Sequence, residues 1–131
     1  MNNQNPIEIY QAQDGTTQVE VRFEKDTVWL SQAQMANVFD TSSDNISLHL
    51  RNIFNESELD ENLTSEDFSV VRQEGKRQVT RKVKHYNLDA IISVGYRVKS
   101  KSATNFRIWA TARLKEYLTQ GYTINQQRLK Q

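Results

Sequence analysis

The stretch that decides the fold runs from residue 31 to residue 54 and reads SQAQMANVFDTSSDNISLHLRNIF. Ser31 is placed to cap a first short helix, whose apolar stripe consists of Met35, Ala36, Val38 and Phe39. After the polar residues 40–42, Ser43 is placed to cap a second helix. Its apolar residues recur at spacings of three and four, at Ile46, Leu50, Ile53 and Phe54. Two short helices joined by a tight polar turn predict a helix-turn-helix.

Two residues bear on the geometry of this motif. Ala36 is small enough for the second helix to cross the first at close range. The turn usually contains a glycine, because one of its residues adopts a left-handed backbone conformation. Asp40 stands at that position here. Aspartate tolerates the left-handed conformation better than most residues, so we expect a helix-turn-helix with an aspartate in its turn.

The residues before the motif alternate as strands do. One face of a predicted strand is apolar and the other is polar, and the apolar face consists of Val19, Val21 and Phe23. Ile7 and Ile9 also alternate with polar neighbours, and Asp14-Gly15 is a turn signal between the two segments. Residues 28–30, Val-Trp-Leu, lead directly into the first helix. These patterns predict an N-terminal β meander.

After the motif, residues 56–67 form an acidic stretch with six carboxylates and turn-like character. Residues 68–72 and 79–86 flank Gln73-Glu74-Gly75-Lys76 and predict a β-hairpin that turns at Gly75. Asn87 is placed to cap a third helix, whose apolar residues are Leu88, Ile91, Ile92 and Val94. A basic connection, residues 96–101, leads to a last helix. We expect Ser102 to open that helix and Gly121 to close it, with an apolar stripe of Ala103, Phe106, Ala110, Leu114 and Tyr117, widened by Trp109 and Leu118.

These elements predict one α+β domain over residues 1–122. It consists of the N-terminal β meander, the helix-turn-helix, a basic wing-like β-hairpin and two C-terminal helices. Residues 123–131 are polar and weakly patterned, and are expected to be a tail or the start of a further region.

Composition narrows the function classes. The 131 residues include no cysteine, which excludes disulfides, thiolate metal sites and cysteine nucleophiles and favours a cytoplasmic protein. The first residues, MNNQNP, lack the apolar core of a signal peptide, and no apolar run has the length of about 18 residues that a membrane span needs. We therefore expect neither a membrane association nor a cofactor.

The charge is divided between the two halves of the chain. Residues 1–68 carry a net charge of −10 and residues 69–131 a net charge of +11, although the whole chain has a formal net charge of only +1. A positive field of this density attracts polyanions. Between Arg72 and Lys84, thirteen residues include six lysines and arginines.

A basic ribbon beside a helix-turn-helix predicts a winged-helix protein that binds double-stranded DNA, with a helix in the major groove and the ribbon on phosphates. Asparagine and arginine side chains match the hydrogen-bonding edges of adenine and guanine. The base-facing candidates on the second helix are Ser43, Asn45, Ser47, His49 and Arg51. The phosphate-binding candidates are Lys76, Arg77, Arg81, Lys82 and Lys84 on the ribbon and Arg97, Lys99 and Lys101 in the basic connection. We expect the protein to bind DNA as a homodimer.

Two alternatives come from other functional classes. The acidic half of one copy, which includes the acidic stretch, could dock on the basic half of another copy or of a partner toxin, which would make the chain a protein-interaction module. Asp67 followed by Glu74-Gly75-Lys76 also matches the metal-binding pattern of many nucleases. A hairpin turn explains the same residues, so we expect a protein that is not an enzyme, with a metal-dependent nuclease as the third hypothesis.

Several longer segments resemble the RhuM virulence-protein family. They are residues 28–36 (VWLSQAQMA), 49–54 (HLRNIF), 58–62 (ELDEN), 83–98 (VKHYNLDAIISVGYRV) and 106–111 (FRIWAT). The last segment, with the closing Gly121-Tyr122, is also similar to the N-terminal domain of phage antirepressors. The resemblance implies a bacterial DNA-binding protein from a regulatory or mobile-element setting. Because members of the family are typically longer, it also implies an N-terminal domain or a shortened copy. It supplies no catalytic residue.

Overall fold

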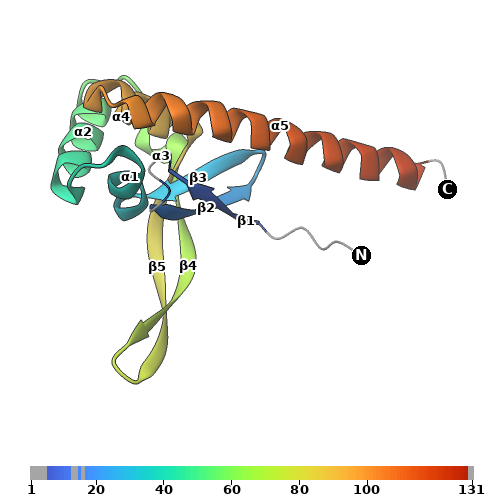
Figure 1. Ribbon diagram of the computed structural model, residues 1–131, viewed down its shortest axis with the longest axis horizontal. Coiled ribbons are helices and arrows are strands. Elements are labelled where there is room, and N and C mark those ends of the chain that lie inside the picture. The colour runs from blue at the N-terminus through green and yellow to red at the C-terminus, as the bar shows by residue number, and fades with distance from the viewer. Residues whose placement is uncertain (1–5, 13–14, 16, 130–131) are drawn as a thin grey trace.

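The computed structural model describes residues 6–12, 15 and 17–129, and side chains only as far as Gln120. Within these residues the chain forms one antiparallel sheet and five helices (Figure 1), which confirms the α+β class. The strands are β1 (Ile7–Gln11), β2 (Gln18–Glu24), β3 (Thr27–Ser31), β4 (Ser65–Glu74) and β5 (Arg77–Asn87), and their order in the sheet is β1-β2-β3-β5-β4. The helices are α1 (Gln32–Phe39), α2 (Ser43–Asn55), α3 (Glu61–Thr64), α4 (Leu88–Val98) and α5 (Lys101–Leu129).

The N-terminal β meander is present, with one correction to its first strand. Val19, Val21 and Phe23 are buried, as their alternation predicts. In β1, however, the buried residue is Tyr10, whereas Ile9 is 53% exposed. Tyr10 is paired with Val19 and therefore faces the helices, where its ring packs edge-on against Phe106. An aromatic side chain buries a large apolar area, which favours the face of β1 that carries Tyr10.

The helix-turn-helix is also present. Ser31 caps α1 through its hydroxyl, and Gln34 completes a capping box by accepting a hydrogen bond from the Ser31 backbone. Asp40 has the predicted left-handed conformation, with φ of 53°. Ser42, and not Ser43, caps α2, because its hydroxyl accepts a hydrogen bond from the Asn45 amide at 3.0 Å.

The hairpin is longer than predicted. Its strands extend inward to Ser65 and Asn87, and the turn contains only Gly75 and Lys76. Gly75 has φ of 63°, so a glycine suits this first turn position. β5 pairs with β3 only through residues 85–87, so that residues 67–84 form a two-stranded ribbon that projects from the body (Figure 1). We call residues 67–84 the ribbon.

The two C-terminal helices differ from prediction at their ends. Asn87 caps α4 as expected, but α4 continues through Arg97 to Val98 and leaves only residues 99 and 100 as a connection. α5 begins at Lys101, one residue before the predicted Ser102, and it does not end at Gly121 but continues to Leu129. Leu118, expected in the apolar stripe, is 41% exposed, because the buried part of α5 centres on Phe106 and Ala110.

The core lies between the helices and one face of the sheet. Leu30, Val28 and Phe23 of the sheet are fully buried against Met35, Ile46, Ile53 and Ile91 from the helices. Trp109 of α5 joins this core through edge-on contacts with Tyr10 and Phe23. Among the described residues, no helix has the length and apolar character needed to cross a membrane.

Candidate nucleic-acid interface

The predicted base-facing residues lie on two different flanks of α2. A helix turns by about 100° per residue, so Ser47 and Arg51 share one flank, while Asn45 and His49 share the other. The side-chain amide of Asn45 donates a hydrogen bond to the Thr41 hydroxyl at 2.9 Å. Asn45 therefore contributes to the turn of the motif, and one groove cannot contact all of the predicted residues at once.

Three exposed residues of α2, namely Asp44, Leu48 and Asn55, were absent from the predicted set of base-facing residues. Asn55 lies on the flank of Arg51, four residues farther along the helix, and is exposed. Leu48 lies in the middle of the exposed face and is 45% exposed. Helical spacing would have identified both Asn55 and Leu48. Asn55 follows Arg51 by four positions, and Leu48, two positions from Ile46 and from Leu50, lies on the side of the helix opposite the apolar stripe.

The flank of Ser47, Arg51 and Asn55 faces the base of the ribbon. These three residues line a hollow of about 220 Å³ together with Gln32, Glu61 and Tyr86. Tyr86 belongs to β5, and its ring is stacked on Phe54 of α2 with the ring centroids 6.2 Å apart. This stacking fixes the position of α2 relative to the ribbon. Ser43 is at the start of α2, where Gln32 donates to its hydroxyl at 3.0 Å.

The basic side chains of the ribbon are divided between its two faces. Strand alternation places Lys82 and Lys84 on the face of Tyr86, which is the face that the helices cover at the base of the ribbon. Arg77 and Arg81 lie on the opposite face, with His85, and Lys76 lies in the turn. The predicted phosphate-binding residues are therefore not one continuous row beside α2.

Some of these cations already have acidic partners. Arg81 donates two hydrogen bonds to Glu74, at 2.8 and 3.1 Å, which raise the pKa of Arg81 and lower that of Glu74. Lys84 lies 3.0 Å from a carboxylate oxygen of Glu61, and this hydrogen bond raises the pKa of Lys84. In the part of the chain that the structure describes, the ribbon cations without an ion-pair partner are Arg72, Lys76, Arg77 and Lys82.

The side chain of Arg97, on α4, forms ion pairs with carboxylates at the end of α2 and just after it. One of its guanidinium nitrogens lies 2.9 Å from Glu56 and 2.8 Å from Glu58. The hydrogen bonds to these two carboxylates raise the pKa of Arg97 well above its ordinary value, and the same contact lowers the pKa of Glu58. Lys99 and Lys101, at the junction of α4 and α5, make no ion pair with any described residue.

The acidic stretch is largely neutralised within the chain. Glu56 and Glu58 pair with Arg97, Glu61 pairs with Lys84, and Glu66 pairs with Lys25. Asp60 accepts a hydrogen bond from the Asn62 amide and caps α3. Less negative charge is therefore left for a second copy than the sequence indicates.

The pair of carboxylates behind the nuclease hypothesis is widely separated. Asp67 and Glu74 are seven residues apart on β4, which corresponds to about 23 Å at the usual rise of a strand. An odd separation also places them on opposite faces of the ribbon. These two carboxylates cannot bind one metal ion, and the described residues include no group of three or more potential ligands placed to do so.

Comparison with known proteins gives one match. Residues 63–131 match the sequence model of the Virulence protein RhuM family, a span that includes the ribbon, α4 and α5 and more than half of the chain. The helix-turn-helix lies before the matched span. No curated protein matches the chain, and no solved structure does so.

Proposed function

The chain belongs to the RhuM virulence-protein family, and we propose that it binds double-stranded DNA in a regulatory or mobile-element setting. One observation carries this proposal: the polar flank of α2 lines a hollow together with Tyr86, the β5 residue that lies just beyond the ribbon. A helix of a helix-turn-helix can enter the major groove only where its exposed flank and the flanking phosphate contacts face the same side. Ser47, Arg51 and Asn55 meet this condition, with Lys82 on the adjoining ribbon face.

The proposed contacts divide into two kinds. Arg51, which is exposed and has no ion-pair partner among the described residues, would read guanine, and Asn55 would read adenine. The unpaired ribbon cations would contact phosphates and supply affinity without sequence preference. Arg97 and Lys84 would contribute less than the sequence indicates, because carboxylates of the same chain already bind them. We retain the homodimer as part of the proposal.

The test is fluorescence anisotropy with labelled duplexes, after selection of bound sequences from a random duplex pool. Arg51→Ala should weaken binding to the selected sequence about 10-fold or more and binding to mixed-sequence DNA much less, because a good base contact is worth about 1–3 kcal/mol. The matched control is Lys115→Ala in the middle of α5, which should retain binding, because Lys115 is exposed and makes no ion pair with any described residue. If no duplex is retained at low salt, the proposal is wrong.

A further inference from the structure

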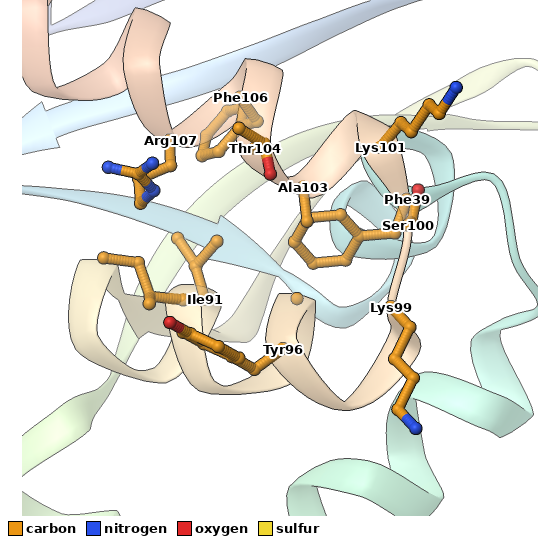
Figure 2. A pocket seen from close by; sticks show the side chains of 12 residues that line it. Phe39, Ile91, Tyr96, Lys99, Ser100, Lys101, Ala103, Thr104, Phe106 and Arg107 are labelled. Carbon is orange, nitrogen blue, oxygen red and sulfur yellow. The ribbon is translucent and has the colours of Figure 1, made fainter.

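A second hollow lies between the end of α4 and the first turns of α5 (Figure 2). Its volume is about 800 Å³, within the usual range of small-molecule sites. It shares no lining residue with the hollow beside α2. We call it the α4–α5 cleft; it is not lined by α2 or by the ribbon, to which the proposed DNA contacts belong.

The floor of the α4–α5 cleft is apolar and rigid. Phe106, Ile91 and Gly95, which line it, are buried residues of the core. At Gly95 the two helices are in close contact, since a Cβ atom there would lie 2.8 Å from the Cβ of Ala103. Such a floor keeps its shape without a ligand and offers an apolar surface to a ring or hydrocarbon.

The rim of the cleft is cationic. The lining residues include Lys99, Lys101 and Arg107, and they include no carboxylate. No ion pair or side-chain hydrogen bond within the described part of the chain occupies these three cations. Lys99 also has a left-handed backbone conformation, with φ of 58°, and the residue in this conformation at a helix end is usually a glycine. In a chain with 16 carboxylates, an acid-free rim favours an anionic ligand.

A tyrosine completes the cleft at one end. Tyr96 is 80% exposed although it is a large aromatic residue. In Figure 2 its hydroxyl and the Arg107 guanidinium lie toward the same end, whereas Lys99 and Lys101 lie at the other. A guanidinium matches the geometry of a phosphate, and an exposed ring provides a surface on which a planar group can stack.

We propose that the α4–α5 cleft binds a free mononucleotide. The base would lie between the ring of Tyr96 and the apolar floor, and the phosphate would accept hydrogen bonds from Arg107. Lys99 and Lys101 would increase the local concentration of the anion. The ligand class follows from the combination of a planar aromatic surface, an apolar floor and a cationic rim, since neither a neutral ring nor inorganic phosphate would use all three.

The experiment titrates the whole chain with AMP and GMP and follows backbone amide resonances together with the heat of binding. Shifts should centre on Gly95, Tyr96 and Thr104. Adenosine, guanosine and inorganic phosphate should each bind about 10-fold more weakly or worse, because each lacks one half of the contacts. Arg107→Gln should weaken AMP or GMP binding about 10-fold and Tyr96→Ser about 5-fold or more, whereas Lys115→Gln on the same helix should change it less than about 2-fold.

Three results would overturn the proposal. The first is an absence of shifts around the cleft at millimolar nucleotide. The second is equal binding of inorganic phosphate, which would mean non-specific attraction of anions. The third is displacement of the nucleotide by a mixed-sequence duplex, which would place the cleft in the nucleic-acid interface. Arg107 and Tyr96 are both exposed, so we expect both variants to fold. Arg107→Lys provides a second variant, which keeps the positive charge but loses the forked hydrogen-bonding geometry of the guanidinium. If Arg51→Ala loses DNA but keeps AMP, the two sites are independent.

Discussion

Gly95 is the residue at which α4 and α5 cross most tightly. A glycine inside a helix ordinarily lowers stability by about 1 kcal/mol relative to alanine, so Gly95→Ala would be expected to stabilise an isolated α4. In the folded chain the added methyl group would lie 2.8 Å from the Cβ of Ala103 and 3.4 Å from the Phe39 ring. Overpacking of this kind costs about 1–3 kcal/mol. Because the opposing atom is next to the α5 backbone and cannot rotate away, we expect a net decrease in the free energy of unfolding in urea.

The compensating change is Ala103→Gly, which removes the opposing methyl group. Alone it should destabilise α5 by about 1 kcal/mol. Combined with Gly95→Ala it should restore part of the stability, so the two changes should be non-additive. Additive losses would show that the crossing tolerates a methyl group and that Gly95 has another role.

His85 is a buried histidine at the base of the ribbon. It is 3% exposed, its Nδ1 atom lies 2.8 Å from the Val83 carbonyl oxygen, and its ring packs edge-on against Phe68. Burial lowers the pKa of His85, with a smaller contribution from Arg22, while the Val83 carbonyl and Asp67 act in the opposite direction. The side chain is therefore neutral in the folded protein at neutral pH.

This lowered pKa predicts a pH dependence of stability. In the unfolded chain His85 binds a proton near pH 6.5, whereas in the folded chain it does so only at lower pH. The free energy of unfolding should therefore fall as the pH decreases below about 6.5. His85→Gln should reduce this slope, although it will also lower stability by removing the contact with Phe68. Urea unfolding between pH 8 and 5 measures the difference. The paired carboxylates Glu58 and Glu74 titrate in both proteins and cancel in the comparison; equal slopes would mean that His85 is not the titrating group.

At the scale of elements, the sequence predicted what depends on local chemistry. The helix-turn-helix followed from apolar spacing and caps, and Asn87 was recognised as a cap because its side chain accepts from an amide three residues later. Helix ends set by tertiary contacts were missed: nothing local shows that α4 continues through Arg97 until the pair with Glu56 and Glu58 is seen. Glycine at position 121 resembles a helix stop, but the backbone around it remains helical.

The candidate site was predicted with the same limits. The second helix and the basic ribbon were predicted to face DNA; the structure places α2 and Tyr86, the β5 residue just beyond the ribbon, around one hollow. The assignment of residues to faces failed because exposure on α2 depends on which neighbours cover its two flanks. The internal partners of Lys84 and Arg97 could not be assigned residue by residue, because these side chains pair with carboxylates far away in the sequence.

The ribbon should be separable from the fold. Residues 77–84 pair only with β4, and residues 71–78 are all exposed. Deleting residues 71–74 and 77–80 joins Val70 and Arg81 through the native Gly75-Lys76 turn. Val70 and Arg81 are already partners across the ladder, and the even shift gives them the same hydrogen-bonding type as the Glu74–Arg77 pair that now flanks the turn. The thermal midpoint should change little, because no buried residue is removed.

The same deletion should weaken DNA binding through electrostatics. It removes Arg72 and Arg77, two of the ribbon cations that make no ion pair with a described residue, and it also removes Glu74, which releases Arg81 from its ion pair. If Arg72 and Arg77 contact phosphates, the slope of log affinity against log salt concentration should become shallower by about 2, or by about 1 if the released Arg81 replaces one of these contacts. Measuring affinity at several salt concentrations tests this, and an unchanged slope would exclude the ribbon tip from the interface. A chain that no longer unfolds cooperatively would contradict the independence of the ribbon.

For the whole molecule, the separation of charge along the sequence is not a separation in space. The halves differ by a net charge of −10 against +11, but ion pairs join them at Arg97, Lys84 and Arg113, the last to Glu8 of β1. The field that remains for a partner is mainly that of the ribbon and of the α4–α5 junction. DNA and a mononucleotide would thus be attracted to different unpaired cations of one molecule.

This internal pairing predicts that self-association is insensitive to salt. If the acidic stretch of one copy docked on the basic half of another, raising the salt concentration from about 0.1 M to about 1 M would shorten the Debye length from about 10 Å to about 3 Å and dissociate the copies. Because four of the six carboxylates in the stretch already have partners in their own chain, we expect the mass measured by light scattering to stay at that of the proposed dimer in both solutions. DNA affinity of the same samples should fall steeply over this range. A mass that halves at high salt, together with no retention of DNA at low salt, would favour the interaction module. The exposed basic residues that we propose to contact DNA would then contact a second copy of the chain.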